Sequence, residues 1–287
     1  MLDLDPNREG VTPVEAATLI LLRNGPAGPE VFCVERNRKS AFMGGAIVFP
    51  GGKLDAGDRN PSWVQRSTPP RTPQSPFGAD ESTLRALAVA ACRETLEEAA
   101  ILPVEGGTLT HQERLDLRAR LAGGKDTLLD FLAARGLRLD LARLHPFARW
   151  ITPVQEARRF DARFFVAEAS GAEPGAHDAH ETMSSFWARP NDVLSRFAAG
   201  ELQLAPPTHR TLEMLQGAAS PAKLLEHAKL NCLEPICPRL VVHRDAAGET
   251  LALTLPGDPE HEVKTARVPG RSRFVLRRDR WLPEDPP

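Results

Sequence analysis

The sequence predicts a mixed α+β fold, and three patterns support this prediction. Residues 84–101 form an alanine-rich run without Gly or Pro, which indicates a long helix. Apolar runs at 15–23, 31–36 and 46–49 have the length of buried strands. The stretch 24–29 contains two Gly and two Pro residues and has turn chemistry, so the first two strands are expected to pair as a hairpin.

The rest of the chain carries further elements of both kinds. Short helices are predicted at 112–121, 127–135, 191–199 and 208–216. Strands are predicted at 144–151, 163–168, 183–187 and 274–276, with a second hairpin from 240–243 and 250–255. Residues 59–80 contain five prolines and many polar residues, so this segment is expected to be a solvated loop without a core of its own.

Composition limits the class of protein. The 287 residues include 36 Lys and Arg against 38 Asp and Glu, so no general attraction to nucleic acid or membranes is expected. No apolar run is long enough to span a bilayer, and the acidic N-terminal segment lacks the apolar region of a signal peptide. Four cysteines are too few for a disulfide scaffold, so we expect a cytoplasmic protein.

Three glutamates near the end of the long predicted helix are the first candidate functional residues. At about 100° per residue, Glu94, Glu97 and Glu98 fall within one narrow arc, and Arg93 is placed to brace them. Crowded carboxylates repel one another, and a hard divalent cation such as Mg²⁺ or Mn²⁺ would relieve that repulsion. The alternative is a solvated acidic helix surface, which is what most charge runs are.

A glycine pair follows the predicted strand at 46–49. Gly51 and Gly52 let the backbone turn sharply and bring a carbonyl oxygen close to a ligand. Taken with the acidic helix, this stretch resembles the Nudix hydrolase family, whose sequence box joins a glycine and an acid to Arg-Glu-(apolar)-x-Glu-Glu-x-Gly. Gly52 opens the box here, Asp58 holds the acid position, and Arg93 begins the second half.

The match departs from the family pattern in three ways. The usual short spacer is 34 residues long here, from Arg59 to Cys92. Thr95 replaces an apolar residue, and Ala100 replaces the glycine that normally ends the helix. An interrupted box is found in the family branch that includes acyl-coenzyme A diphosphatases. The chain also resembles that branch at 42–58, 150–153 and 159–165.

The resemblance implies a Nudix-type α/β/α sandwich with a mixed central sheet, and it implies roles for the box residues. Glu97 and Glu98 would be ligands of Mg²⁺ or Mn²⁺, and the carbonyl of Gly52 a further ligand. Glu94 would be a ligand or the general base, oriented by Arg93. Mg²⁺ or Mn²⁺ is therefore the expected cofactor.

A further acid is expected beyond the box, as metal ligand or general base. Glu181, just before the predicted strand at 183–187, is the first candidate, with an exposed strand-end carboxylate as the alternative. His177 and His180 lie just before it and are not needed by the chemistry. Glu156 is a weaker second candidate.

Basic residues close to the box are candidates for binding substrate phosphates, with which Arg pairs well. These candidates are Arg36, Arg38, Lys39 and Lys53. The alternative is ordinary surface charge. Two cysteines and two histidines lie near one another in the sequence, at 227–243, which is compatible with a zinc site. The wide spacing of Cys232 and Cys237 favours reduced core cysteines instead.

The predicted organisation is a Nudix hydrolase domain at 12–216, with residues 59–80 inserted in the box, and a C-terminal extension at 217–287. The insertion could act as a lid, and the extension could form a homodimer or cover the substrate. The implied function is metal-dependent hydrolysis of a diphosphate linkage in a nucleotide-derived small molecule, with coenzyme A or acyl-coenzyme A the expected substrate. The alternatives are ADP-ribose, a dinucleotide or a damaged nucleotide as substrate, and a non-catalytic Nudix-fold ligand sensor.

Overall fold

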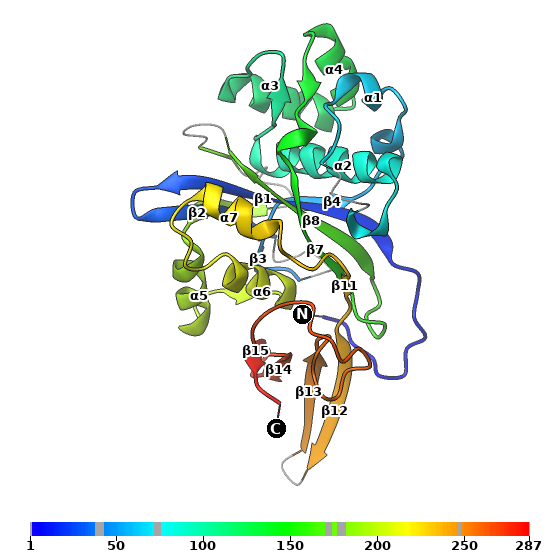
Figure 1. The fold of residues 1–287 in the computed structure, drawn as a ribbon, viewed down its shortest axis with the longest axis vertical. Coiled ribbons are helices and arrows are strands. Elements are labelled where there is room, and N and C mark those ends of the chain that lie inside the picture. The colour runs from blue at the N-terminus through cyan, green and yellow to red at the C-terminus, as the bar shows by residue number, and fades with distance from the viewer. Residues whose placement is uncertain are drawn as a thin grey trace.

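A mixed sheet with helices on both sides forms the centre of the molecule in the computed structural model, which describes residues 2–37, 43–71, 76–169, 174–176, 182–245 and 248–286 (Figure 1). Over these residues the sheet has nine strands in the order β10-β3-β2-β1-β8-β7-β11, with β4 paired to β1 and β9 to β2. Its strands are β1 (Val14–Gly25), β2 (Gly28–Arg36), β3 (Ala46–Val48), β4 (Gly51–Lys53), β7 (His145–Ile151), β8 (Phe160–Glu168), β9 (Thr182–Ala188), β10 (Gln203–Leu204) and β11 (Pro235–Ile236). The predicted α+β sandwich with a mixed central sheet is confirmed.

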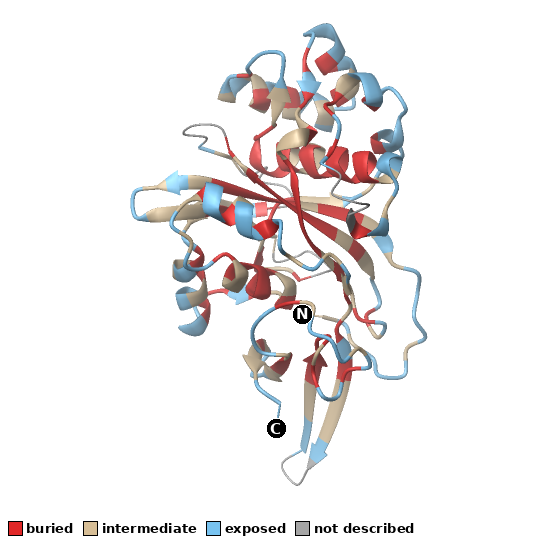
Figure 2. Ribbon diagram, in the orientation of Figure 1, coloured by how far each residue is buried: buried red, intermediate tan, exposed pale blue. Residues whose placement is uncertain are grey.

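Both faces of this sheet are buried, and the strand sequences show why. Along β1, Leu19 and Leu21 belong to one hydrophobic cluster, whereas Ile20 and Leu22 belong to the other. Successive side chains of a strand point to opposite faces, so a continuous apolar run such as 19–22 needs cover on both sides. Figure 2 shows the buried residues concentrated in the strands and on the inner sides of the helices.

One layer of helices is centred on α2 (Glu81–Ala99), with α1 (Trp63–Arg66), α3 (His111–Ala122) and α4 (Leu128–Ala134) around it (Figure 1). The carboxylate of Asp80 accepts a hydrogen bond from the Thr83 backbone N–H at 2.7 Å, so Asp80 caps α2. The opposite layer contains α5 (Pro190–Ala198), α6 (Pro206–Met214) and α7 (Pro221–Ala228). The helix α7 was not predicted.

The segment 59–80 is not the solvated loop that its prolines predicted. It contains α1 and the short helical turn Pro76–Gly78, and Trp63 and Phe77 are 4% and 3% exposed within the hydrophobic cluster that includes α2. The guanidinium of Arg85 on α2 donates hydrogen bonds to the Ser67 hydroxyl at 2.7 Å and to the Thr68 carbonyl at 3.2 Å. Two aromatic side chains and a buried arginine therefore anchor the described part of the insertion to the core.

A second sheet lies in the C-terminal part of the chain. It contains β12 (Arg239–Asp245), β13 (Gly248–Thr254), β14 (Arg273–Arg277) and β15 (Arg280–Glu284), paired antiparallel in this order. The predicted hairpin at 240–255 is confirmed as β12 and β13. Earlier in this part of the chain, β11 pairs with β7 of the main sheet, so the separate sheet begins at β12. A small pair, β5 (Val104–Glu105) and β6 (Arg138–Leu139), lies apart from both sheets.

None of the helices in the described residues combines the length and hydropathy that a bilayer span requires.

Candidate active site

The candidate site is at one end of the main sheet, where three strand ends come together. β2 is antiparallel to β1, β3 is antiparallel to β2, and β4 is antiparallel to β1. β3 and β4 therefore run in opposite directions, and the chain reverses between them at Phe49 and Pro50. The start of β3 lies beside the end of β2, because the Gly45 backbone N–H donates to the Arg36 carbonyl at 3.1 Å. These strand ends and Gly52 consequently lie at the same end of the sheet.

The glycine turn touches the acidic face of α2. The Gly51 backbone N–H donates a hydrogen bond to Oε2 of Glu98 at 3.0 Å. A Cβ atom added to Gly52 would lie 2.4 Å from the carboxyl carbon of Glu94, and one added to Gly51 would lie 2.6 Å from the Ala17 carbonyl oxygen. No side chain fits at either position without a shift of its neighbours. The predicted approach of these two stretches, more than forty residues apart, is present in the structure.

Arg93 is the centre of the carboxylate cluster. Its Nε and Nη2 donate to the two oxygens of Asp58, both at 3.0 Å, in a bidentate pair. Its Nη1 donates to Glu94 at 2.9 Å and to Glu97 at 3.2 Å. The predicted bracing by Arg93 is therefore seen, and Asp58 is the partner that fixes it. The sequence placed Asp58 at the acid position of the box without assigning it this contact.

The acidic face is largely enclosed, which is not what a solvated helix surface would show. The Glu98 residue is 4% exposed and the Glu94 side chain 13%, while the Glu97 side chain is 39% exposed. Burial raises the pKa of Glu97, and the opposing effect of Arg93 does not cancel it. Burial also lowers the pKa of Arg93, but hydrogen bonds to Asp58 and the charge of Glu94 outweigh it and leave that pKa raised. Arg93 is therefore a permanent cation.

The chemistry of this cluster suits a divalent cation. Asp58, Glu94, Glu97 and Glu98 present only oxygen donors, as hard divalent metals prefer, and among the described residues Arg93 contacts three of these four carboxylates. Within the described residues, no three Asp, Glu, His or Cys side chains are gathered closely enough to hold a metal ion. Arg93 contacts both Glu94 and Glu97, and Glu98 turns to the Gly51 amide. The donors fit a metal by type, and Glu97 is the most exposed of them.

The end of α2 explains the two unusual residues of the box. Thr95 is fully buried, and its hydroxyl donates to the Ala91 carbonyl at 2.7 Å, so the polar group is satisfied inside the helix. Ala100 follows the last helical residue in the left-handed conformation, with φ 53° and ψ 36°. Glycine adopts this conformation without strain, whereas alanine does not. The position therefore keeps the backbone geometry of a glycine-terminated helix.

The predicted phosphate-binding residues fall into two groups. Arg36 ends β2 and is half-buried; among the described residues its guanidinium has no hydrogen-bond or ion-pair partner, and its Nε is fully covered. Lys53 is exposed at the end of β4, where its backbone carbonyl accepts from Arg93 at 2.9 Å. Arg38, Lys39 and Glu181 lie outside the described residues, as do His177 and His180.

The weaker candidates lie elsewhere in the fold. Glu156 is 2% exposed, and its carboxylate accepts a hydrogen bond from the Asp3 backbone N–H at 2.7 Å, so it holds the N-terminal segment. Cys232 is exposed and Cys237 is half-buried, so the expectation that both are core cysteines is wrong for Cys232. Cys92 is buried in α2, where burial raises the pKa of its thiol.

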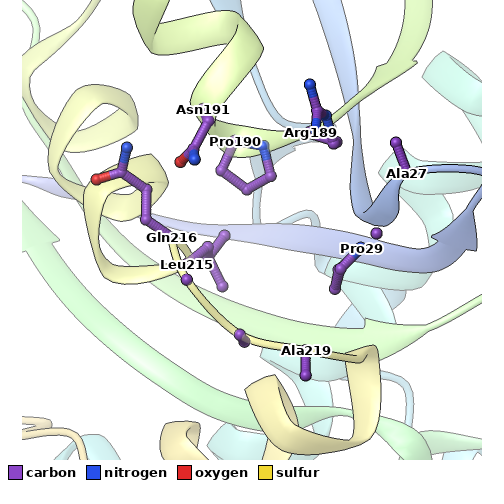
Figure 3. Close-up of a pocket in the computed structure, with 11 residues that line it drawn as sticks. Ala27, Pro29, Arg189, Pro190, Asn191, Leu215, Gln216 and Ala219 are labelled. Carbon is purple, nitrogen blue, oxygen red and sulfur yellow. The ribbon is translucent and has the colours of Figure 1, made fainter.

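A separate cavity of about 330 Å³ opens between the β1–β2 hairpin, the start of α5 and the segment after α6 (Figure 3). Its lining includes Ala27, Pro29, Arg189, Asn191 and Gln216. None of the box carboxylates lines it, and Arg189 is already paired with Asp192 through two hydrogen bonds of 2.9 and 2.7 Å. This cavity is distinct from the acidic site.

The fold and the box together define a class. The crystal structure of a NUDIX hydrolase from Alicyclobacillus acidocaldarius is 31% identical in sequence, and it superposes with a TM-score of 0.65 over 75% of this chain and 96% of that one. The chain belongs to the Nudix hydrolase family and is a Nudix hydrolase. Enzymes of this family generally use divalent metal ions.

Within that family the similarity points to one branch. The model of the NUDT19 Nudix domain matches residues 78–215. Acyl-coenzyme A diphosphatase NUDT19 from Gallus gallus is 28% identical over 277 residues, covering 82% of this chain and 73% of that protein. The Homo sapiens protein of the same name is 27% identical over 273 residues, covering 80% and 72%. These two matches extend across about four-fifths of the chain.

Proposed function

We propose that this Nudix hydrolase cleaves the diphosphate linkage of coenzyme A or acyl-coenzyme A, with Mg²⁺ or Mn²⁺ as cofactor. The contact of the Gly51–Gly52 turn with the acidic face of α2 is the observation that carries the proposal, because it assembles both halves of the divided box. The substrate class comes from the similarity to acyl-coenzyme A diphosphatases.

The box residues have separate roles in this proposal. Glu97, Glu98 and the carbonyl of Gly52 would hold the metal, with Glu94 as a ligand or the general base. A bound divalent ion neutralises diphosphate charge and lowers the pKa of a water molecule bound to it. Arg93 fixes the Glu94 carboxylate by a 2.9 Å hydrogen bond, and Asp58 fixes Arg93 in turn.

Arg36 supports substrate binding at the same end of the sheet. A half-buried guanidinium without a carboxylate partner among the described residues is unusual in a chain with this many acidic groups. Phosphate oxygens accept two parallel hydrogen bonds from guanidinium, which makes a diphosphate a suitable partner. We propose that Arg36 binds the diphosphate, with Arg38, Lys39 and Lys53 adding positive charge and Glu181 serving as a further ligand or base.

The reaction adds water across one P–O bond of the diphosphate. One phosphorus gains the water oxygen, the bridging oxygen leaves with the other phosphate, and the proton removed from water passes first to the base. Coenzyme A would yield 3′,5′-ADP and 4′-phosphopantetheine. An acyl-coenzyme A would yield 3′,5′-ADP and the acylated phosphopantetheine.

A panel assay in the presence of Mg²⁺ or Mn²⁺ tests this function. The panel contains coenzyme A, a short and a long acyl-coenzyme A, ADP-ribose and a diadenosine polyphosphate, with products identified by mass spectrometry. We expect 3′,5′-ADP from the coenzyme A derivatives and no product after chelation of the metal. Faster hydrolysis of ADP-ribose or of the dinucleotide would replace the substrate assignment, and binding of coenzyme A without turnover of any compound would identify a ligand sensor.

A further inference from the structure

A second cavity, of about 200 Å³, lies between the main sheet and the C-terminal sheet. Three parts of the chain line it: the turn entering β3, the short strand β10, and the β14–β15 hairpin. The lining residues are Met43, Gly44, Ala46, Gln203, Leu204, Asp279 and Trp281. The hairpin lies beyond residue 215, where the match to the Nudix domain model ends. The C-terminal sheet therefore contributes a wall that lies outside the residues matched by that domain model.

The cavity lies at the end of the sheet that carries the acidic site. Its wall includes the start of β3, and β3 and β4 run in opposite directions, so Ala46 and Gly52 lie at the same end. At roughly 3.3 Å per residue, the chain between them spans at most about 20 Å. A long substrate whose diphosphate is held beside Gly52 can place a flexible arm in this cavity.

The backbone around the cavity is strained. Five described residues other than glycine have a positive φ, and two of them, Met43 (51°) and Asp279 (63°), line the cavity, with Arg278 (48°) directly before Asp279. Arg278 and Asp279 form the two-residue turn of the β14–β15 hairpin, a position where Asn-Gly is the favoured sequence. Strained residues of this kind concentrate at ligand-binding sites, where the geometry of the wall matters more than its local stability.

The chemistry of the lining selects the occupant. Met43, Ala46, Leu204 and the Trp281 ring give apolar walls, while Gln203 supplies an amide and Asp279 a carboxylate. The Trp281 indole N–H is buried and has no acceptor among the described residues, so that side chain contributes only its ring. The carboxylate disfavours another anion, and a plain fatty chain would leave both polar groups unused. A neutral chain with amide N–H groups fits best, and the volume holds about six or seven water-sized groups.

We propose that this cavity binds the pantetheine arm of the substrate, and that the C-terminal sheet thereby completes the substrate site. The proposal rests on the proposed function for its choice of substrate. The cavity has room for one amide group of the arm and the methylene groups next to it. Asp279 would accept the N–H of that amide, Gln203 would donate to its carbonyl, and Trp281 and Met43 would cover the methylene groups. The arm does not react, so these contacts contribute to KM rather than kcat.

Binding is tested without catalysis by ¹⁵N NMR of the indole groups. The chain has four tryptophans, and four Trp→Phe variants assign their four signals. Titration with pantetheine, which carries neither adenine nor phosphate, is expected to shift the Trp281 signal to saturation. The Trp150 signal is the control, because Trp150 is equally buried with an unpartnered N–H and is outside this cavity. A Trp281 signal that stays in place overturns the assignment.

Steady-state kinetics with coenzyme A provide a second test. Asp279→Asn keeps a residue that tolerates the left-handed conformation and removes the charge. We expect its KM to rise about three- to tenfold with kcat unchanged, because the Asn carbonyl still accepts a hydrogen bond and only the contribution of the charge is lost. Asp285→Asn is the control, an exposed substitution next to the same sheet. Its KM for coenzyme A is expected to stay within about twofold of the parent value. Hydrolysis of coenzyme A with an unmoved Trp281 signal refutes the cavity alone, whereas a shifted signal without hydrolysis refutes the proposed function alone.

Discussion

Two arginines in this molecule make the same bidentate contact with a buried aspartate and serve different purposes. Arg273 in the C-terminal sheet donates to Asp258 at 2.9 and 2.7 Å, and contacts Glu260 at 2.9 Å. Arg93 donates to Asp58 at 3.0 and 3.0 Å, and then contacts Glu94 and Glu97. Asp258 and Asp58 are both almost completely buried, at 0% and 3% exposure.

The two clusters differ in how many carboxylates surround the arginine. Around Arg273 the second carboxylate, Glu260, is shared with His243 at 3.3 Å, and the Ser272 hydroxyl donates to Asp258. Among the described residues, Arg93 contacts four carboxylates, those of Asp58, Glu94, Glu97 and, at 3.7 Å, Asp55, and Glu98 lies beside them. A buried ion pair with satisfied neighbours is a structural element, whereas unbalanced carboxylates in one place are costly unless a cation joins them. The imbalance, rather than the ion pair, marks the functional site.

Replacing one carboxylate in each cluster gives the largest expected contrast. Glu97→Gln removes a proposed metal ligand and should lower kcat at least about 1,000-fold while the protein stays folded. Glu260→Gln is the matched control, because its side chain is 37% exposed against 39% for Glu97 and each contacts an arginine. The control should keep kcat within about twofold. Assays with the preferred substrate of the panel measure kcat of each variant, and circular dichroism shows whether each variant is folded. A fully active Glu97→Gln enzyme would refute the ligand role.

The sequence predicted the acidic cluster around Arg93 better than it predicted the cluster around Arg273 and Asp258. Glu94, Glu97 and Glu98 are fixed by local helix geometry, and Gly52 is fixed by its box position, so a single sequence was enough to bring them together. The sequence did not predict the packing of Trp63 and Phe77, because that packing depends on contacts with distant helices. The prolines of the segment predicted a loop, and two isolated aromatic residues were too weak a signal to predict burial. The Arg273–Asp258 pair left no sequence signal, since its partners lie on a loop and a strand whose meeting depends on the sheet register.

Removing the buried aspartate from each cluster should separate stability from catalysis. Asp258→Asn leaves Arg273 buried without its full partner and should lower the free energy of unfolding by about 3 kcal/mol. Its kcat should not change. Asp58→Asn should cost a similar amount of stability and also lower kcat/KM by about 10- to 100-fold, because Arg93 no longer orients Glu94. Urea unfolding and steady-state kinetics give the two quantities. Equal activity losses in both variants would remove the distinction between the clusters.

Acid titration tests the structural role of the Arg273–Asp258 pair. Burial alone would raise the pKa of Asp258. Hydrogen bonds from Arg273 and Ser272 have the larger effect, so the net result is a lowered pKa in the folded state. Above the unfolded value of about 3.9 the ionised form gives its full stabilisation. As the pH falls below that value, the unfolded chain takes up a proton that the native cluster resists, and this stabilisation is lost. The stability difference between parent and Asp258→Asn should therefore shrink below about pH 4; a constant difference would contradict the assignment.

The smallest expected effect is at the end of the acidic helix. Ala100→Gly removes left-handed strain of about 1–2 kcal/mol and forfeits burial of one methyl group, about 0.8 kcal/mol. Glycine also adds backbone freedom to the unfolded chain, which costs about 0.4–1 kcal/mol, so denaturant unfolding should show a net change within about 1 kcal/mol of zero. Ala90→Gly, in the interior of the same helix, should instead cost about 2 kcal/mol, because Ala90 has helical dihedrals and is fully buried, so the change relieves no strain and forfeits its methyl burial. If the two substitutions destabilise alike, Ala100 is not strained. If Ala100→Gly is clearly the milder of the two, this end of α2 carries stored strain beside Glu97 and Glu98.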